Sequence, residues 1–295
     1  MIVSASYRTD IPAFYGPWFD NRFRAGWAMV ANPYGGRPSR VALREGVDGY
    51  VFWTRNIGPF LPSLAMVTAA GLPFVVQYTV TNYPRPFEPS VIPAERSLAL
   101  IRRLADQWGP RVAVWRYDPI LISDLTPEEW HLDNFAGLAT VLAGAVDEVV
   151  VSFAQIYRKT ARHLAVAAKL HHFAWEDPAA GRKRHLIDRL SQIAAPHGMR
   201  LTLCTQPDLA DDRIPAARCI DVARLSDLAG HPFAARLKGN RPGCLCAESR
   251  DIGDYDSCPH GCVYCYAVGS RGLAKRRFRD QDPAGEFLAF PAAER

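Results

Sequence analysis

The sequence has no long apolar segment, and its start lacks a basic stretch followed by an apolar one. No apolar run approaches the ~20 residues that span a bilayer. The opening residues, MIVSASYRTD, do not have the pattern of a secretory signal peptide. These absences predict a cytoplasmic protein with no membrane partner. In that reducing compartment the seven cysteines are expected to be metal ligands or redox groups, and not a disulfide framework.

The motif G-x-G-x-x-G is also missing after the first apolar run, which argues against a dinucleotide-binding Rossmann domain. The chain instead has eight short apolar runs, at 2–6, 27–31, 50–54, 74–79, 112–117, 148–153, 200–205 and 218–221. Helix-like segments lie between them, at 93–108, 126–144, 159–172 and 183–197. This alternation predicts a (β/α)8 TIM-type barrel over residues 1–236, with a doubly wound open sheet as the alternative.

Polar and charged residues follow the expected strands. A parallel barrel brings the carboxyl ends of its strands to one mouth, where active sites lie. The candidates for catalysis are Arg8, Asp10, Arg116, Asp118 and Cys204. The candidates for holding a cofactor are Arg55, Gln77, Gly35 and Gly36. The same charged residues also suit ion pairs that brace the rim, and a glycine pair after a strand is often only a turn.

A change in composition marks residues 237–295, which are expected to form a cysteine-rich segment packed on the barrel mouth. Cys258, Cys262 and Cys265 have the spacing C-x3-C-x2-C in this segment. Three thiolates so close along the chain can converge on one metal centre, because zinc and iron–sulfur centres prefer thiolate ligands.

The identity of that centre is open at this point. Three cysteines and one open position suit a [4Fe–4S] cluster, whereas a tetrahedral zinc needs a fourth protein ligand. Cys244, Cys246 or His260 could supply that fourth ligand. Cys244 and Cys246 could equally serve a second centre or act as a redox pair.

The C-x3-C-x2-C motif, with Tyr264 before its third cysteine and Tyr266-Ala267 after it, resembles the signature of radical S-adenosylmethionine enzymes. The residues of the motif are most similar to those of the spore photoproduct lyase-like branch of this superfamily. The resemblance implies a [4Fe–4S] cluster on the three cysteines, with S-adenosylmethionine on the fourth iron and Tyr264 beside the cofactor. It also implies a reductant protein of the flavodoxin or ferredoxin type and a 5′-deoxyadenosyl radical that attacks the substrate.

The whole chain resembles a prokaryotic family known as domain of unknown function 1848. The matching segments are 4–12, 51–56, 115–120 and 251–253. In radical S-adenosylmethionine enzymes the cysteine loop follows the first barrel strand, whereas here it comes last. A circular permutation would reconcile the two arrangements, because chain termini are surface features that tolerate relocation.

Two other functions remain compatible with the sequence. One is a non-catalytic barrel in which a structural zinc or iron–sulfur clasp closes a site for a small anionic ligand. The other is nucleic-acid repair, by analogy with the photoproduct lyase branch. The net charge of +5 permits a small-molecule, nucleotide-like or nucleic-acid partner, and the basic segment 271–279 contains no acid.

Overall fold

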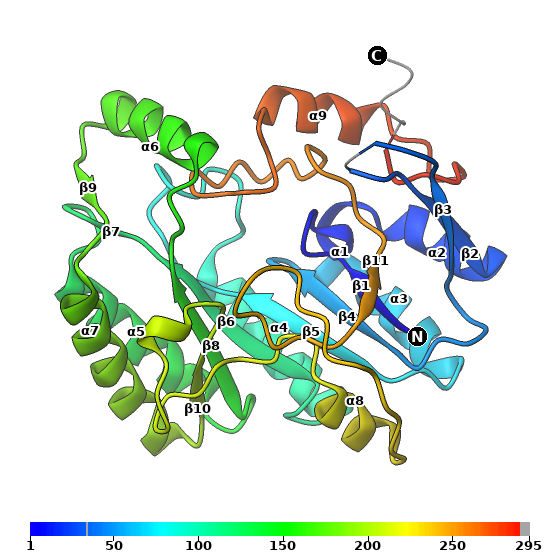
Figure 1. Cartoon of the computed structure of the whole chain (residues 1–295), viewed down its shortest axis with the longest axis horizontal. Helices are drawn as coiled ribbons and strands as arrows, with labels where there is room; N and C mark the ends of the chain where they lie inside the picture. The colour runs from blue at the N-terminus through cyan, green and yellow to red at the C-terminus, as the bar shows by residue number, and fades with distance from the viewer. Residues whose placement is uncertain (34, 290–295) are drawn as a thin grey trace.

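A parallel β-sheet forms the centre of the computed structural model, which describes residues 1–33 and 35–289 (Figure 1). Its strands are β1 (Ile2–Ala5), β4 (Gly49–Thr54), β5 (Phe74–Thr79), β6 (Ala113–Ile120), β8 (Glu148–Phe153), β10 (Arg200–Leu203) and β11 (Ser249–Asp251). They lie in the order β10-β8-β6-β5-β4-β1-β11, and every neighbouring pair is parallel. Spatial order thus follows chain order, except that the last strand precedes the first.

Helices connect the strands, and those that form the main core cover one face of the sheet (Figure 1). The α-helices are α1 (Ile11–Phe14), α2 (Gly16–Ala25), α3 (Leu61–Ala69), α4 (Ala94–Trp108), α5 (Glu128–Leu142), α6 (Arg158–His171), α7 (Ala180–Ala194), α8 (Val222–Ala229) and α9 (Arg271–Arg279). Short 3-10 turns are η1 (Gly58–Phe60), η2 (Ala195–His197) and η3 (Pro207–Leu209). The four helices expected from the sequence are confirmed as α4, α5, α6 and α7. Within the described ranges no helix is both long and apolar enough to cross a membrane.

The main core lies between the sheet and helices α2, α3, α4, α5 and α7. Each of these helices contributes fully buried side chains to one cluster, among them Phe19, Leu64, Ile101, Phe135 and Leu190. Facing them are strand residues Val3, Phe52, Val76, Trp115 and Val151. Burial of this size is the main favourable contribution to folding, at about 25 cal/mol per Å² of apolar surface.

The opposite face of the sheet changes character along the strands. Its first layer is apolar and consists of Ile2, Val51, Val75, Val114 and Val150, one from each of five strands. Because side chains alternate between faces with a period of two, the next residues on this face are Ser4, Trp53, Gln77, Arg116 and Ser152. This face is therefore apolar near the amino ends of the strands and polar near their carboxyl ends.

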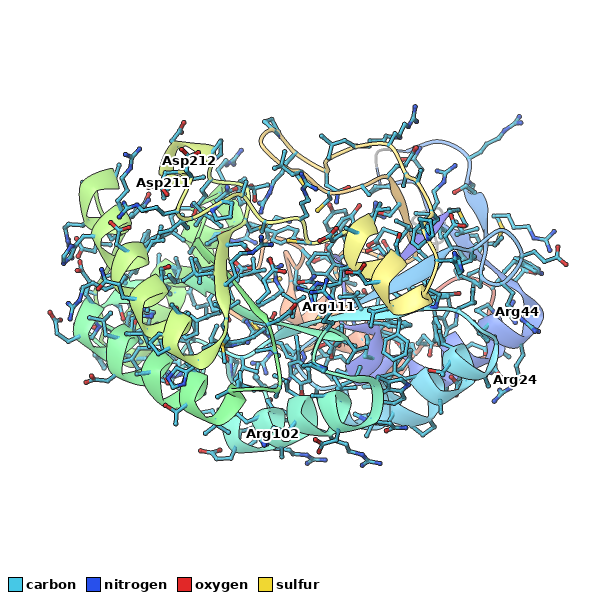
Figure 2. All side chains as sticks on the ribbon, turned by 90° about the horizontal axis from the view of Figure 1, so that it is seen from below. Arg24, Arg44, Arg102, Arg111, Asp211 and Asp212 are labelled. Carbon is cyan, nitrogen blue, oxygen red and sulfur yellow. The ribbon has the colours of Figure 1, made fainter. Side chains whose placement is uncertain are left out.

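Ion pairs hold the amino edge of the sheet together. Arg111, labelled in Figure 2, pairs with Asp147 at 2.7 Å and with Asp227 at 2.9 Å. Arg224 pairs with Asp147 and Glu148, both at 2.8 Å. These residues join the starts of β6 and β8 to α8, so their role is structural.

One expected barrel strand forms elsewhere. Residues 27–31 form β2 (Trp27–Val30), which pairs antiparallel with β3 (Ser39–Ala42) in a hairpin outside the main sheet. The reason is local, because a hairpin partner lies close along the chain and no crossover helix follows β2. A second small sheet pairs β7 (Ile122–Ser123) with β9 (Trp175–Glu176).

The eighth expected strand, residues 218–221, is not a strand in the structure. The backbone of Leu203 exchanges hydrogen bonds of 3.0 Å and 2.8 Å with Pro215 and Ala217, and Ala247 N donates to Ile220 O at 3.0 Å. Single bonds of this kind link the two edges of the sheet but form no ladder. Pro215 lacks the N–H that a longer ladder needs, and Asp221 already caps α8. The sheet is parallel and α/β as expected, but an eight-stranded barrel is not closed among the residues that are described.

Candidate functional site at the carboxyl edge of the sheet

The cysteine loop, residues 252–270, begins directly after β11 and leaves the sheet at its carboxyl edge. Asp251, the last residue of β11, fixes this departure. Its carboxylate accepts hydrogen bonds from Ser4 Oγ at 2.8 Å, Ser6 Oγ at 2.6 Å and Tyr7 N at 3.1 Å. The end of the chain is thereby tied to the first strand.

Arg8, a predicted catalytic residue, lies beside this carboxylate. Burial raises the pKa of Asp251, and the Arg8 guanidinium partly offsets that effect. Arg8 Nε is 3.8 Å from Asp251 Oδ1, and its Nη1 donates a long hydrogen bond of 3.4 Å to Gly253 O. The Nε is buried and has no hydrogen-bond acceptor among the residues described. One buried donor of Arg8 is thus available to an anionic ligand.

Asp10 is also predicted as catalytic, but both oxygens of its carboxylate are engaged in hydrogen bonds that hold the structure together. Its carboxylate accepts from Thr54 Oγ1 at 2.7 Å, Arg55 N at 2.8 Å and Ala13 N at 2.9 Å. The Nε2 of His260, in the cysteine loop, lies 2.9 Å from Asp10 Oδ2, the oxygen that also accepts from Arg55 N. Asp10 therefore joins β4, the start of α1 and the loop, which agrees with the alternative that rim charges brace the fold.

Arg55, predicted to hold a cofactor, lies at the centre of a second buried group. Its guanidinium contacts Glu88 at 2.7 Å and Tyr264 Oη at 2.6 Å, and Thr81 Oγ1 donates to Glu88 at 2.5 Å. Tyr264 also donates to Glu88. Burial opposes the charge on Arg55, but Glu88 and Tyr264 outweigh it and raise the Arg55 pKa. This group clamps Tyr264, one residue before Cys265, onto the strand ends.

Further contacts fix both ends of the loop. Tyr15 Oη donates to Ser257 O at 2.6 Å, and Arg277 Nη1 donates to Tyr255 O at 2.7 Å. At the far end, Arg162 from α6 donates to Gly269 O at 3.0 Å. Figure 1 shows the loop in orange, running between α6 and α9.

The three thiols of the loop lie close enough to influence one another. Burial raises the pKa of Cys262 to about 12 and also raises that of Cys265. The pKa of Cys258 is raised by burial and then by Asp10, with both other thiols adding to the effect. The Arg55 guanidinium opposes the shift at Cys262, and Lys159 is among the groups that oppose it at Cys265.

The fit of a metal centre to this loop rests on its donor set. In residues 1–33 and 35–289 no three His, Cys, Asp or Glu side chains are arranged to hold a metal ion as they stand. The loop nonetheless provides three neighbouring thiols, two of which flank one turn, where Cys265 N donates to Cys262 O at 3.1 Å. Arg55 and Lys159 supply positive charge that offsets thiolate charge. These residues suit a thiolate-held centre once the side chains close around it.

A third polar group lies on the face of the sheet opposite the main core, which we call the inner face. Arg116 Nη1 contacts Gln77 Oε1 at 3.2 Å and Cys219 Sγ at 3.0 Å, and Nη2 pairs with Asp118. The Trp53 ring lies 5.1 Å from the guanidinium carbon, within cation–π range. Burial opposes the charge of Arg116, but Cys219 and Asp118 raise its pKa overall. The structure thus brings together three residues that the sequence predicted, Gln77, Arg116 and Asp118.

The remaining predicted residues lie apart from the loop thiols. Cys204 follows β10, with its Sγ 3.7 Å from Cys219 Sγ. Cys244 and Cys246 interact with each other, and Cys246 also interacts with Cys219. The contacts that the structure assigns to Cys244 and Cys246 therefore place them in a second thiol group. Gly35 and Gly36 lie in the β2–β3 turn, are exposed and have φ values of 88° and 102°.

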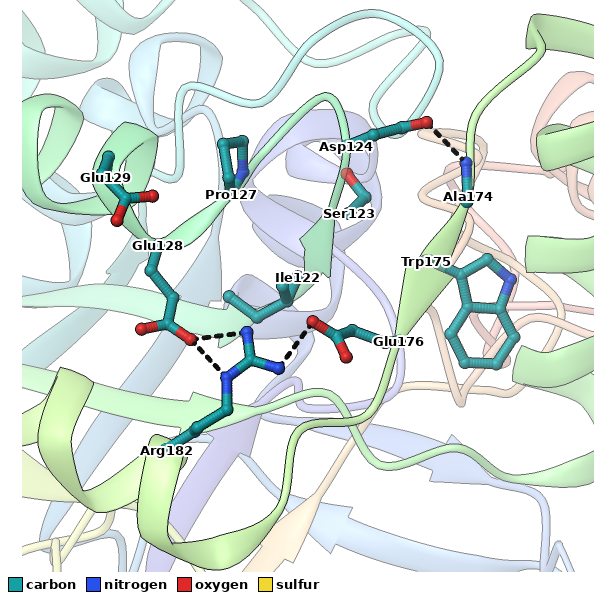
Figure 3. A pocket seen from close by; sticks show the side chains of 10 residues that line it. All are labelled: Ile122, Ser123, Asp124, Pro127, Glu128, Glu129, Ala174, Trp175, Glu176 and Arg182. Carbon is teal, nitrogen blue, oxygen red and sulfur yellow. Dashed lines mark hydrogen bonds and ion pairs between the residues drawn. The ribbon is translucent and has the colours of Figure 1, made fainter.

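Two of the cavities on the surface of the described part of the chain differ in their relation to the site. The larger, of about 470 Å³, lies between α5, β7 and β9, where Arg182 bridges Glu128 and Glu176 (Figure 3). None of the predicted site residues lines it. The smaller, of about 200 Å³, is lined by Arg55 and Glu88 and so belongs to the site.

Three residues of the site were not anticipated from the sequence. Glu88 lies in a proline-rich loop, Asp251 ends a strand without an apolar pattern, and Lys159 is near the start of an amphipathic helix. Each matters only through a partner far along the chain. A buried arginine after a strand, such as Arg55, could have signalled that an acidic partner had to exist.

The fold and site together define a class: a parallel α/β protein whose last strand joins the sheet beside the first and carries a cysteine loop over its carboxyl edge. The chain belongs to the family described as Domain of unknown function (DUF1848), whose model matches residues 2–267. That match includes the whole C-x3-C-x2-C motif. No curated protein matches the sequence.

Proposed function

We propose that this protein is a radical S-adenosylmethionine enzyme with a [4Fe–4S] cluster held by Cys258, Cys262 and Cys265. The observation that carries the proposal is the parallel pairing of β11 with β1. It places the cysteine loop after the strand that comes first in the sheet, although that strand is last in the chain. This is the placement expected for a circularly permuted relative of the radical S-adenosylmethionine barrels.

The surroundings of the loop support the proposal electrostatically. Three thiolates and a cluster would bring net negative charge to a buried place, which is costly without compensation. The Arg55 guanidinium beside Cys262 and the Lys159 ammonium beside Cys265 would supply that compensation. Tyr264 is held between Arg55 and Glu88, so the turn between the second and third cysteine is fixed in place.

The other polar residues at the carboxyl edge of the sheet are suited to binding an anionic, nucleotide-like molecule. When bound, a [4Fe–4S] cluster would supply one-electron reduction of S-adenosylmethionine with an electron from a reductant protein. Arg8 would offer its free Nε donor to a carboxylate or phosphate. Arg116, whose guanidinium is held in position by Gln77 and Asp118, would bind the same molecule at the inner face of the sheet. The substrate would lie over this polar layer.

Anaerobic assay for 5′-deoxyadenosine tests the proposal. The protein is reconstituted with iron and sulfide, then incubated with S-adenosylmethionine and dithionite. We expect visible thiolate-to-iron absorption and 5′-deoxyadenosine from the wild type, with both lost in Cys262→Ala. Cys244→Ser is the matched control, because this cysteine lies outside the loop, and it should retain both signals.

The contrary results are equally definite. One zinc per chain, with no visible absorption after anaerobic reconstitution, would overturn the iron–sulfur assignment. Loss of iron in Cys244→Ser would place Cys244 on the fourth iron and so close the position that S-adenosylmethionine needs.

A second function, the non-catalytic clasp, is favoured by one specific observation. Asp10, Glu88 and Asp251 all have their hydrogen bonds satisfied by protein groups, so the loop is tied to the sheet by the chain alone. A metal centre there would then only reinforce an existing closure. A well-formed cluster that never yields 5′-deoxyadenosine, together with a clear gain in thermal stability on metal binding, would support the clasp.

A further inference from the structure

The four cysteines outside the loop form a group of their own. Cys204 follows β10, Cys219 lies in the irregular segment that links the sheet edges, and Cys244 and Cys246 lie on the returning arm of residues 236–248. They come from three separate parts of the chain. All seven cysteines of the protein are free thiols, so these four are available for chemistry.

Contacts run through the four sulfurs in a line. Cys204 Sγ is 3.7 Å from Cys219 Sγ, and the backbone N of Ile220 lies 3.4 Å from Cys246 Sγ. Cys204, Cys219 and Cys246 belong to one packed cluster with Cys244 packed against it, and Cys246 interacts electrostatically with both Cys219 and Cys244. Because no three of these thiols are arranged to hold a metal ion in the described part of the chain, the arrangement suits pairwise sulfur chemistry better than a single metal ion.

The line runs from the surface into the interior. Cys244 is partly exposed, whereas Cys204, Cys219 and Cys246 are buried. The inner end meets the predicted substrate face, since Arg116 Nη1 donates to Cys219 Sγ at 3.0 Å. The outer end is held by close backbone packing, since a Cβ on Gly239 would lie 2.3 Å from Cys244 O.

The pKa of the thiols also differs between the accessible end and the buried end of the group. A hydrogen bond from Cys246 lowers the pKa of Cys244 to about 6, against the effect of burial. The hydrogen bond from Cys219 lowers the pKa of Cys246, but its own bond to Cys244 and burial outweigh this and raise the value to about 11. The reactive thiolate is therefore placed at the accessible end, where a nucleophile needs to be.

We propose that Cys244 and Cys246 form a thiol–disulfide exchange site that accepts oxidising equivalents from a small or protein disulfide. The Cys244 thiolate attacks one sulfur of the incoming disulfide, forms a mixed disulfide and releases the other half as a thiolate. Cys246 then loses its proton and attacks Cys244 Sγ, which releases the second half as a thiolate. The protein gives up two electrons and one proton and ends with a Cys244–Cys246 disulfide, while the incoming disulfide becomes two thiol-level products.

The inner thiols extend this exchange toward the sheet. Cys219 and Cys246 pack in the same cluster, and Cys204 Sγ lies 3.7 Å from Cys219 Sγ, so the disulfide can move inward by the same reaction without a further oxidant. Each transfer frees one outer thiol and engages one inner thiol. The end product is a Cys204–Cys219 disulfide beside Arg116. Oxidation at the surface is in this way transmitted to the inner face.

Oxidised glutathione is the probe for this site. Anaerobic protein is incubated with it, the remaining thiols are trapped by alkylation, and peptides are mapped by mass spectrometry. We expect disulfides among these four cysteines in the wild type and a stable glutathione adduct on Cys244 in Cys246→Ala. In Cys244→Ser the rate of oxidation of the group should fall by about tenfold or more, because the other three thiols are protonated and buried.

The dependence on pH separates this site from ordinary surface oxidation. Adduct formation in Cys246→Ser, which keeps a hydroxyl donor to Cys244, should decline below pH 7 with a midpoint near the Cys244 pKa. Attachment of glutathione first to another cysteine would overturn the proposal. So would metal bound by the wild type and lost on Cys246→Ala, because ligation would then explain the group. The readout is thiol mapping and does not depend on a cluster in the loop.

Discussion

The two cysteine groups use the same side chain in opposite settings. The loop thiols Cys258, Cys262 and Cys265 lie within eight residues of each other, in one loop that hydrogen bonds hold at several points. The thiols of the second group come from three distant segments and pack together in one cluster. Closeness along the chain favours convergence on one centre, whereas contact built by the fold favours transfer from one sulfur to the next.

The largest expected difference between the groups is in bound iron. Cys258→Ser should reduce iron from about four atoms per chain to less than one, because a cluster does not survive the loss of one of three ligands. Cys246→Ser should leave the iron content unchanged. Metal analysis after anaerobic reconstitution measures both, and equal losses would show that the two groups are one site.

The next largest effect is expected from the arginine that serves the loop. Arg55→Met leaves Glu88 buried without its partner, which costs about 3–5 kcal/mol of stability. Urea unfolding measures this cost. Arg182→Met, which breaks an exposed bridge to Glu128, is the control and should change the midpoint far less. A small effect of Arg55→Met would mean that Tyr264 and Thr81 alone keep the clamp closed.

Two glycines allow each group to be disturbed separately. Gly239→Ala puts a methyl group 2.3 Å from the Cys244 carbonyl oxygen and should cost about 1–3 kcal/mol while it displaces Cys244. Gly261→Ala, at a φ of 80° and against Arg271, disturbs the loop instead. Alkylation of Cys244 should change only in the first variant and iron binding only in the second. Crossed effects would show that the groups are mechanically coupled.

A smaller effect concerns pH. With a pKa of about 6, Cys244 is mostly thiolate at pH 7 and mostly thiol at pH 5, so its alkylation rate should fall by about tenfold between the two. Cys246→Ala removes the hydrogen bond that lowers this pKa, so the midpoint should move up toward the usual value of about 8.5. Peptide-resolved iodoacetamide labelling provides the rates. An unchanged midpoint would point to a cause other than Cys246.

The smallest effect is expected in α9. Lys275 and Arg276 are exposed, whereas Arg277 is buried and donates to Tyr255 O. Replacing Lys275 and Arg276 with Gln should leave the unfolding midpoint unchanged. The nucleic-acid interpretation of the basic segment predicts that the same variant binds DNA more weakly and with less dependence on salt. DNA binding that persists unaltered would remove α9 from that interpretation.

Local patterns predicted the elements that are decided locally. The continuous apolar run Glu148–Phe153 is buried at every residue, and Leu98, Ile101 and Leu104 form the buried side of α4 as their spacing indicates. The strand Ser249–Asp251 could not be found in this way, because it has no apolar pattern. It becomes a strand only through pairing with β1 and the hydrogen bonds of Asp251.

The site residues divide in a similar manner. Arg55 and Arg116 are candidates because charged residues at the carboxyl ends of parallel strands meet at one edge of the sheet. Each of them has an acidic partner in the structure. Which partner they have depends on the fold, so Glu88 was missed. Cys204 and Cys219 are both buried, but their contact across adjacent segments has no counterpart in sequence spacing. The sequence pattern therefore identifies donors better than it identifies pairs.

The pairing of β11 with β1 also sets an order of events during synthesis. Ser4 is made early, but its partner Asp251 is separated from it by 247 residues. Contacts of such long range form slowly, because the chain entropy between them is lost before they stabilise anything. A ribosome adds about 5–20 residues per second. The first strand thus waits for more than ten seconds with one edge uncovered, and the cysteine loop takes its place only after β11 has been made. Loading of the proposed metal centre would therefore follow the pairing of β11 with β1.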